Sequence, residues 1–486
     1  MTDRGEKDYG YFSNRTYCMI LEGSYPFVHG GVSSWTHQYI QAMKEHEFVL
    51  MCIGSEEKDR DKFKYTLPDN VVEVHQYFLD SALKLKTVKN KEKVTRDMVE
   101  ALINLLEGKQ TDWEKFFYLF QEKKLNPVSF LMSEHFLEAI KAVCLEKYPY
   151  ISFAEYFHTV RSMLLPELYL FTQNIPEADI YHATATGYSG LLGSLGKWKY
   201  NSPFILTEHG IYTREREEEL LRAKWVLPYF KKQWISLFYS FSACAYRFAD
   251  KVTSLYEGAA RIQAEIGCEE SKQQVIGNGI HYERFCQVPA KKENGYIDIG
   301  AVVRIAKIKD IKTMLYAFAE LKLRVNNARL FILGDVDDKE YKEECENLIK
   351  QLQIQDVFFT GVVNVIEYIE KFDFTILTSI SEGQPLSILE SFAAGKPVVA
   401  TDVGCCRELV YGNSEDECGQ AGFVVPPMQR EEIANAMERL CVDKALLSRM
   451  AENGKKRAEM YYTHELSMNR YRELYTEVTE YGRNRI

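Results

Sequence analysis

The sequence lacks long hydrophobic runs. None of its apolar segments approaches the roughly 20 residues that a membrane-spanning helix needs. The segment from Met1 to Arg15 is charged and polar, without the apolar stretch of a signal peptide. Hydrophobic residues make up 46% and charged residues 27% of the chain, proportions that are typical of a globular protein and not of a disordered one. We therefore expect a cytoplasmic protein.

Paired cysteines and an excess of basic residues are also missing. The 11 cysteines are scattered, with no Cys-x-x-Cys motif and no paired Cys/His spacing. This distribution favours buried thiols in a reducing compartment over disulfides or a zinc site. The net charge of −10 gives no electrostatic reason to expect nucleic acid as a partner.

Two nucleotide-binding fingerprints are absent as well. The chain contains neither a Gly-x-Gly-x-x-Gly motif nor a Gly-Lys-Ser/Thr P-loop. The missing glycine fingerprint disfavours a nicotinamide-dependent dehydrogenase, because those glycines bring the backbone close to the dinucleotide.

Short apolar runs alternate with helical patterns along most of the chain. Because 486 residues are too many for one ordinary core, we expect two domains. Strands that alternate with helices imply parallel sheets covered on both faces, and two series of runs imply two doubly wound α/β domains. The predicted strands are Tyr17–Leu21, Phe48–Ile53, Val71–His75, Ile180–Ala183 and Phe204–Thr207, and then Ile297–Val303, Leu330–Leu333, Val357–Gly361, Phe374–Leu377 and Pro397–Ala400.

The two series are separated by the turn-forming cluster Ile276-Gly277-Asn278-Gly279-Ile280. We therefore expect a first domain of residues 1–278 and a second of residues 279–462. From about Ser81 to Glu167 strand signals are few, and helical patterns cover Met98–Leu106 and Trp113–Lys123. We interpret residues 81–167 as a helical insertion in the first domain.

The strongest candidate site follows the predicted strand Phe374–Leu377. A glycine and a proline mark a turn there, and we expect a helix to begin near Pro385. The free N–H groups and the dipole of a helix N-terminus favour an anion such as a diphosphate. Glu382 lies before that helix and Glu390 about one turn inside it, so one carboxylate can contact a sugar while the other accepts both hydroxyls of a ribose. The alternative is a surface helix with a capping turn. The segment reads Ser381-Glu382-Gly383-Gln384-Pro385-Leu386-Ser387-Ile388-Leu389-Glu390.

A pair of cations follows another predicted strand. Arg304 and Lys309 come directly after Ile297–Val303. In open α/β sheets, ligands bind beyond the carboxyl ends of the strands. An arginine fork and a lysine charge can hold a diphosphate whose charge grows as it leaves, although such a pair in a loop is often only solvated.

Two weaker candidates lie in the first half of the chain. Gly30 and Gly31 follow the first predicted strand, and they indicate either a plain turn or a close approach of the backbone to a ligand. His209 ends the strand Phe204–Thr207 in the segment Leu206-Thr207-Glu208-His209-Gly210. A single histidine is often structural, but this one lies at the carboxyl end of a strand.

These motifs resemble those of family 4 glycosyltransferases, which have the GT-B fold. The family carries an Arg/Lys pair and two glutamates separated by seven residues. Within it, the glycosyltransferases of Pel exopolysaccharide synthesis resemble this chain over nearly its whole length, including Gly23-Ser24-Tyr25-Pro26, Gly30-Gly31-Val32-Ser33-Ser34-Trp35 and Leu206-Thr207-Glu208-His209-Gly210-Ile211-Tyr212. One departure is Val303 before Arg304, where the family more often has glycine.

The resemblance implies a GT-B fold with two Rossmann-like domains facing a cleft, in which residues 463–486 cross back to the first domain. It implies a retaining hexosyltransferase that moves sugar from a UDP-sugar to a growing polysaccharide, without a metal or another cofactor. Export proteins of the inner membrane would be partners, with the enzyme cytoplasmic or peripheral to that membrane. Arg304 and Lys309 would bind the diphosphate, Glu382 the sugar and Glu390 the ribose. Gly30 and Gly31 would line the cleft, and His209 would lie near the reacting sugar as a catalytic residue. The rest of the donor would be bound by Gly383, Gln384, Pro385, Leu386 and Ser387.

Two alternatives remain open. A UDP-sugar 2-epimerase of the same fold would share the domains and the nucleotide site but would transfer no sugar. A non-catalytic assembly subunit would keep the fold but lose the cations and carboxylates, which are present here.

Overall fold

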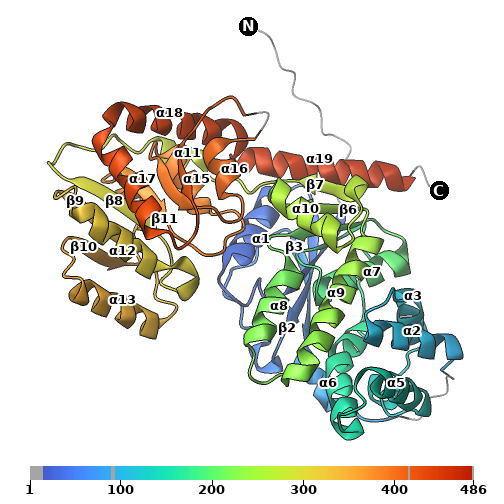
Figure 1. The fold of residues 1–486 in the computed structure, drawn as a ribbon. Helices are drawn as coiled ribbons and strands as arrows, with labels where there is room; N and C mark the ends of the chain where they lie inside the picture. The colour runs from blue at the N-terminus through green and yellow to red at the C-terminus, as the bar shows by residue number, and fades with distance from the viewer. Residues whose placement is uncertain (1–14, 89–93, 414–415, 484–486) are drawn as a thin grey trace. The chain divides into compact units, whose positions relative to one another are not determined.

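In the computed structural model, residues 15–88, 94–413 and 416–483 are described. The first fourteen residues, on which part of the expected cytoplasmic location depends, lie outside that range. The chain folds into two compact units (Figure 1). The first contains Met1–Ser254, Ala260–Gln274 and Glu473–Ile486, and the second contains Leu255–Ala259 and Val275–Arg472. The predicted boundary after residue 278 falls just inside the second unit.

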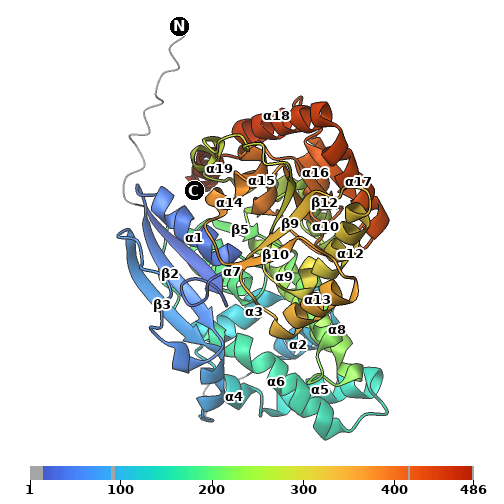
Figure 2. The same ribbon diagram turned by 90° about the vertical axis from the view of Figure 1, so that its left-hand side faces the viewer.

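The first unit is built on a seven-stranded sheet of order β3-β2-β1-β4-β5-β6-β7. Figure 2 shows β2 and β3 side by side at one edge. The inner strands form because their apolar runs are buried on both faces, as parallel strands between helical layers require. The strands are β1 (Thr16–Glu22), β2 (Glu47–Gly54), β3 (Val71–Phe78), β4 (Ile180–Ala183), β5 (Phe204–Glu208), β6 (Lys251–Ser254) and β7 (Gln273–Val275).

Among the described residues, five α-helices lie between β3 and β4, where the sequence predicted an insertion. Both ribbon views place them together at one end of the first unit. The predicted helix at 113–123 is α-helical only to Phe117 and continues as a π-helical turn to Glu122. These helices are α2 (Arg96–Glu107), α3 (Trp113–Phe117), α4 (Pro127–Phe130), α5 (Glu134–Lys147) and α6 (Phe153–Phe171), and the helices beside the sheet are α1 (Gly31–Ala42), α7 (Tyr188–Tyr200), α8 (Tyr212–Arg222), α9 (Lys231–Phe248) and α10 (Glu257–Ile266).

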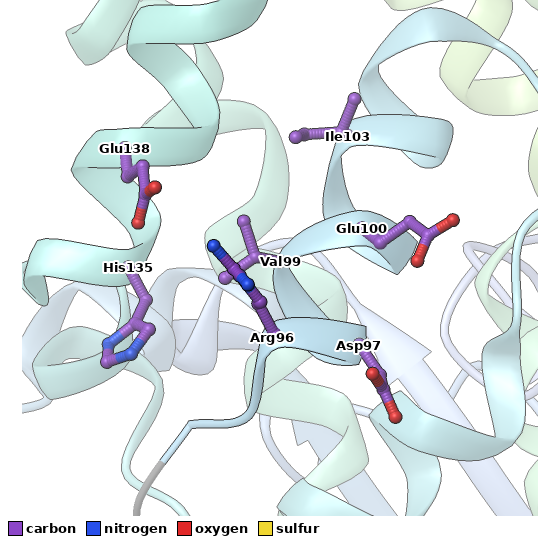
Figure 3. A pocket seen from close by; sticks show the side chains of 7 residues that line it. All are labelled: Arg96, Asp97, Val99, Glu100, Ile103, His135 and Glu138. Carbon is purple, nitrogen blue, oxygen red and sulfur yellow. The ribbon is translucent and has the colours of Figure 1, made fainter.

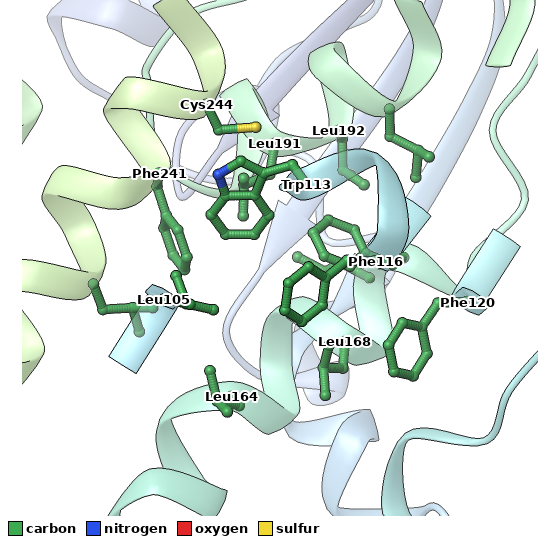
Figure 4. Close-up of a cluster of buried hydrophobic side chains, with 14 of the residues drawn as sticks. Leu105, Trp113, Phe116, Phe120, Leu164, Leu168, Leu191, Leu192, Phe241 and Cys244 are labelled. Carbon is green, nitrogen blue, oxygen red and sulfur yellow. The ribbon is translucent and has the colours of Figure 1, made fainter. Parts of the chain in front are cut away.

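The inserted helices share one core with the helices beside the sheet. Figure 4 shows Trp113 and Phe116 of α3 among Leu168 of α6, Leu192 of α7 and Phe241 of α9. Trp113 packs edge-on against Phe241, with ring centroids 6.0 Å apart. Because interiors are close-packed, removal of such a ring would leave a cavity between the insertion and α9. The insertion is therefore part of the first unit and not a separate body.

The second unit has a six-stranded sheet of order β10-β9-β8-β11-β12-β13. All strand pairs of this sheet are parallel. With two parallel sheets flanked by helices, the predicted fold of two Rossmann-like domains is confirmed. The elements are β8 (Ile297–Val302), β9 (Ala328–Leu333), β10 (Val357–Gly361), β11 (Phe374–Leu377), β12 (Val398–Thr401) and β13 (Gly422–Val425), with α11 (Tyr282–Cys286), α12 (Ile311–Lys322), α13 (Lys339–Gln351), α14 (Val365–Ile369), α15 (Leu386–Ala393), α16 (Cys406–Tyr411), α17 (Arg430–Val442) and α18 (Lys444–Tyr461). Helix α19 (His464–Arg483) begins in the second unit and belongs to the first from Glu473 onward.

Candidate active site

The two strongest sequence motifs meet at the centre of the second sheet. The chain runs from β8 to β9 and β10 on one side, and β11, β12 and β13 extend the sheet on the other. The point where the strand order reverses leaves a crevice at the carboxyl ends of β8 and β11, which is where doubly wound sheets bind ligands. Lys309 follows β8 and Glu382 follows β11, so the sheet topology brings them to the same place.

Lys309 and Glu382 form an ion pair in that crevice. The Nζ of Lys309 lies 2.5 Å from Oε1 of Glu382, and the two side chains are 16% and 13% exposed. The hydroxyl of Ser379 donates to the same carboxylate oxygen at 2.6 Å. The hydroxyl of Thr378 donates to the main-chain carbonyl of Lys309 at 3.0 Å, which ties the two loops together. The site therefore holds a positive charge and a carboxylate that are both largely shielded from water.

Arg304 is not part of this pair. Its guanidinium forms an ion pair with Asp337, which follows β9, and its side chain is 64% exposed. The preceding residue, Val303, is 5% exposed and belongs to the core of the second unit. The valine that departs from the family's glycine therefore faces the core, so its side chain does not obstruct the loop.

Helix α15 begins at Leu386, in agreement with the predicted start near Pro385. Pro385 is the N-cap, with a φ of −73°, and Leu386 is the first helical residue. The first N–H groups of an α-helix have no partner within the helix, so those of Leu386 and Ser387 are available to an anion. Gly383 precedes them, and its carbonyl accepts the N–H of Cys405 at 3.0 Å. This contact holds the turn against the segment after β12.

Glu390 lies one turn inside α15. Burial raises the pKa of its carboxyl to about 7, and the nearby Arg284 opposes that rise. An ionised Glu390 has two acceptor oxygens for neighbouring hydroxyls. The side chain of Gln384, a predicted donor-binding residue, is hydrogen-bonded to the backbone of Asn278.

The glycine motif of the first unit lies at the start of α1. Gly30 is the N-cap residue of this helix. A Cβ placed on Gly30 or on Gly31 would meet no atom within 4 Å. Packing within the chain therefore does not require glycine at either position, and the space beside both backbones is open.

His209 follows β5 and is packed against Trp35, with ring centroids 4.5 Å apart. Its Nε2 atom is buried and has no hydrogen-bond partner within the described part of the chain. Burial lowers the pKa of the imidazole to about 4, so the ring is neutral near pH 7. A neutral imidazole offers one donor and one acceptor nitrogen.

Sequence reasoning missed the carboxylate that anchors the loop of His209. Glu208 is 2% exposed. It accepts hydrogen bonds from Tyr246 at 2.6 Å and Gln263 at 2.9 Å, and burial raises the pKa of its carboxyl. An acidic residue that ends an apolar strand was the available signal, because a buried carboxylate at that position needs dedicated partners.

A separate hollow of about 570 Å³ lies between α2 and α5 of the insertion (Figure 3). None of the predicted site residues lines it. It lies on the helical insertion and not at a strand end, and we assign it no catalytic role. Its lining consists of Arg96, Asp97, Val99, Glu100, Ile103, His135 and Glu138.

Two further findings concern metals and membranes. In the described part of the chain, no group of three or more His, Cys, Asp or Glu side chains is placed to hold a metal ion. Among the helices that the structure describes, none combines the length and the apolar character needed to cross a membrane.

Two family models match the chain. The model of a family described as "Domain of unknown function (DUF3492)" matches residues 15–271. The model described as "Glycosyl transferases group 1" matches residues 286–457, which include the Lys309–Glu382 pair and Glu390.

Relatives of known activity match the chain at low identity. The MMP alpha-(1->4)-mannosyltransferase of Mycolicibacterium hassiacum is 24% identical over 58% of this chain. The capsular polysaccharide biosynthesis glycosyltransferase CapM of Staphylococcus aureus is 25% identical over 43%. The chain spans 66% and 56% of the lengths of these two proteins, less than two thirds of each.

A solved structure shares the fold over almost the whole chain. HepE from Anabaena, crystallised with UDP and glucose, matches with a TM-score of 0.57 over 94% of this chain and 99% of its own. The sequences are 15% identical, so this likeness establishes the GT-B architecture alone.

Proposed function

The chain belongs to the family described as a domain of unknown function (DUF3492), and we propose that it is a glycosyltransferase whose second unit holds a nucleotide-sugar donor. The observation that carries the proposal is the shielded Lys309–Glu382 pair at the reversal point of the second sheet. Helix α15 begins just after Pro385, a few residues beyond Glu382 in the sequence. A cation and free N–H groups suit the diphosphate, and a carboxylate suits the sugar hydroxyls. The match to the group 1 glycosyl transferases over residues 286–457 supports the same assignment.

Each residue of this site has a distinct part in the proposed reaction. Lys309, with Arg304 once it turns from Asp337, neutralises the diphosphate. The N–H groups at Leu386 and Ser387 add to that stabilisation. Glu382 accepts hydrogen bonds from the sugar, and Glu390 accepts them from the ribose. Negative charge develops on the phosphate as its bond to the sugar breaks. These groups are already in place to stabilise that charge, and such preorganised groups make the largest electrostatic contribution to catalysis.

The transfer retains the configuration of the sugar. The bond from C1 of the sugar to the β-phosphate oxygen breaks, and its electron pair leaves with the nucleoside diphosphate. The acceptor oxygen bonds to C1 on the same face and gives its proton to the leaving phosphate. A covalent carboxylate intermediate is not required. In the first unit, His209 and the open space at Gly30 and Gly31 are our candidates for contacts with the sugar substrates.

We further propose a UDP-sugar donor, a hexose as the transferred group and a polysaccharide acceptor. The UDP and glucose bound to HepE and the capsular polysaccharide role of CapM support these choices. The N-terminal motifs resemble those of PelF, the glycosyltransferase of Pel exopolysaccharide synthesis, and this resemblance supports the Pel exopolysaccharide as the product. It also supports inner-membrane export proteins as partners and a cytoplasmic location, with peripheral attachment to that membrane.

The proposed transfer uses no metal, since Lys309, Arg304 and the helix N-terminus take the part of Mg²⁺. Turnover should therefore survive excess EDTA. Loss of activity with EDTA and its return with Mg²⁺ or Mn²⁺ would overturn this assignment.

A panel of nucleotide sugars tests the function itself. A ligand at 100 times its Kd stabilises the folded protein by about 2.7 kcal/mol, so the matching donor raises the melting temperature and the others do not. Incubation of that donor with and without a saccharide acceptor then separates the activities. Transfer to the acceptor supports a glycosyltransferase, whereas isomerisation of the donor alone identifies an epimerase. Binding without either reaction identifies a non-catalytic subunit.

A further inference from the structure

The side chain of Gln384 is committed to the protein backbone. Gln384 lies between Gly383 and Pro385, and a residue before proline is restricted to extended conformations, which limits where its side chain can point. Its Oε1 accepts the N–H of Asn278 at 2.6 Å, and its Nε2 donates to the carbonyl of Asn278 at 3.2 Å. Gln384 is 9% exposed. A two-point contact this well shielded from water fixes the 382–385 loop against residue 278.

Asn278 belongs to the segment through which the chain enters the second unit. We call residues 275–280 the entry segment and residues 462–467, which precede the passage of α19 back to the first unit, the exit segment. The N–H of Ile280 donates to the carbonyl of Tyr462 at 2.8 Å, and the N–H of His464 donates to the carbonyl of Ile280 at 2.8 Å. A Cβ on Gly279 would collide with the backbone of Thr463. The two segments are therefore in direct backbone contact.

The opposite side of the 382–385 loop is held as well. Gly404 has a φ of +53°, and a Cβ at that position would collide with the carbonyl oxygens of Glu382 and Gly383. The N–H of Cys405 donates to the carbonyl of Gly383. The loop is therefore held on one side by the 404–405 turn and on the other by the contact of Gln384 with Asn278.

From these contacts we propose that Gln384 is a positioning residue that couples the nucleotide-sugar site to the entry and exit segments. The inference rests on the proposed function, because it takes the 382–385 loop as part of the donor site. A ligand that orders this loop restrains residues 275–280 through Gln384, and the exit segment through Ile280. By linkage, a protein whose entry and exit segments are already restrained binds the ligand more tightly.

Hydrogen exchange of the full chain, with and without saturating UDP, tests the coupling. The amides of Ile280 and His464 are the probes, because both donate to backbone carbonyls that substitution of Gln384 does not remove. In the wild-type protein we expect UDP to slow their exchange about fivefold or more, the lower end of typical coupling between sites. Amides of α13 in the same unit report any general stabilisation and are used to correct for it.

Gln384→Met keeps the length of the side chain and removes both hydrogen bonds. We expect it to bind UDP while the slowing at Ile280 and His464 falls below about twofold. Gln384→Glu keeps an oxygen that accepts from Asn278, so it should retain more of the slowing than Gln384→Met. Gln351→Met, a matched change at an exposed position at the end of α13, should behave as the wild type.

Each outcome decides between the two proposals. A wild-type protein that binds no nucleotide sugar contradicts the proposed function, and this inference falls with it. Binding of UDP without slowing at Ile280 and His464 contradicts the coupling alone. Equal slowing in the wild type and in Gln384→Met assigns the coupling to other contacts.

Discussion

At the scale of single residues, the two cations of the candidate site differ in their surroundings. Lys309 is 16% exposed beside a carboxylate that is 13% exposed. Arg304 is 64% exposed beside Asp337. Exposed ion pairs contribute little to stability, whereas the loss of one partner from a shielded pair leaves an uncompensated charge. A diphosphate can therefore recruit Arg304 at little cost, but it must share Lys309 with Glu382.

Replacement of each cation by methionine tests that difference. Lys309→Met should lower the free energy of unfolding by about 1–3 kcal/mol, less than for a fully buried pair because Ser379 still donates to Glu382. Arg304→Met should change it by less than about 1 kcal/mol. Lys309→Met should also reduce turnover ~100–1000-fold, the loss typical for one preorganised donor, with a much smaller loss of donor affinity. Urea denaturation and steady-state kinetics measure both. Equal destabilisation by the two substitutions, or losses of affinity and rate of the same size, would contradict the assigned roles.

Glu390 gives the protein a defined pH dependence. Its pKa is raised from 4.5 to about 7 in the folded chain, so the folded state holds this proton more tightly than the unfolded state. The protonated Glu390 therefore stabilises the folded state at low pH. This contribution is complete below about pH 4.5 and is lost as the pH rises through about 7. Glu390→Gln removes the charge. Its stability relative to the wild type should rise by about 1–3 kcal/mol between pH 5 and pH 8. A difference that does not change with pH, measured by urea denaturation, would show that Glu390 is not shifted.

At the scale of elements, the site consists of loops fixed by neighbouring loops. The 382–385 loop rests on Gly404, whose φ of +53° and crowded Cβ position both require glycine. Gly395, at the end of α15, has a similar φ of +66° but no atom within 4 Å of a Cβ. A comparison of the two positions therefore distinguishes the effect of backbone strain, which both share, from the effect of a steric clash with the site, which only Gly404 would cause.

Alanine substitutions at these glycines should therefore differ in their effect on the donor. Both carry the cost of a left-handed conformation, about 1–2 kcal/mol of stability. Only Gly404→Ala displaces the carbonyls of Glu382 and Gly383, so it alone should weaken UDP binding, about tenfold or more for a loss of 1.4 kcal/mol or greater. Calorimetric titration with UDP measures this. Similar UDP affinities in both folded variants would remove the 404–405 turn from the support of the site.

At the scale of the whole molecule, the chain closes the first unit with its last helix. Residues of α19 from Glu473 onward belong to the first unit, where the hydroxyl of Tyr475 lies 2.7 Å from Nδ1 of His182 on β4. The other ring nitrogen of His182 lies 2.7 Å from the hydroxyl of Thr207 on β5. A residue near the end of the sequence thus contributes to the interior of a sheet formed from its beginning.

Tyr475→Phe removes only the hydroxyl of this buried contact. We expect the free energy of unfolding to fall by about 1–3 kcal/mol, because His182 loses a hydrogen-bond partner in a site shielded from water. Tyr150→Phe is the matched control, since Tyr150 is fully exposed, and it should leave the melting temperature unchanged. If both substitutions have the same effect in a thermal melt, α19 does not stabilise the first unit through Tyr475.

The sequence predicted most of the strands, including the edge strands β3 and β10, and missed three others. The apolar runs that form β1, β2, β8 and β11 are buried on both faces, and their apolar composition predicts this burial. Strands β6, β7 and β13 went unpredicted. Lys251–Ser254 and Gln273–Val275 hold too few apolar residues to show a pattern, and these strands form because a neighbouring strand supplies their hydrogen bonds.

The sequence by itself determined the two parallel sheets, the helical insertion and the residue types at the strand ends, because these follow from local periodicity and turn chemistry. The positions of Lys309, Glu382, Glu390 and His209 in the sequence made them candidates for the same reason. Only the tertiary structure decided which partners they have. Lys309 pairs with Glu382, Arg304 with Asp337, and Gln384 with the backbone of Asn278. Partners separated by 33 to 106 positions in the chain are brought together by strand order, which local sequence patterns do not encode.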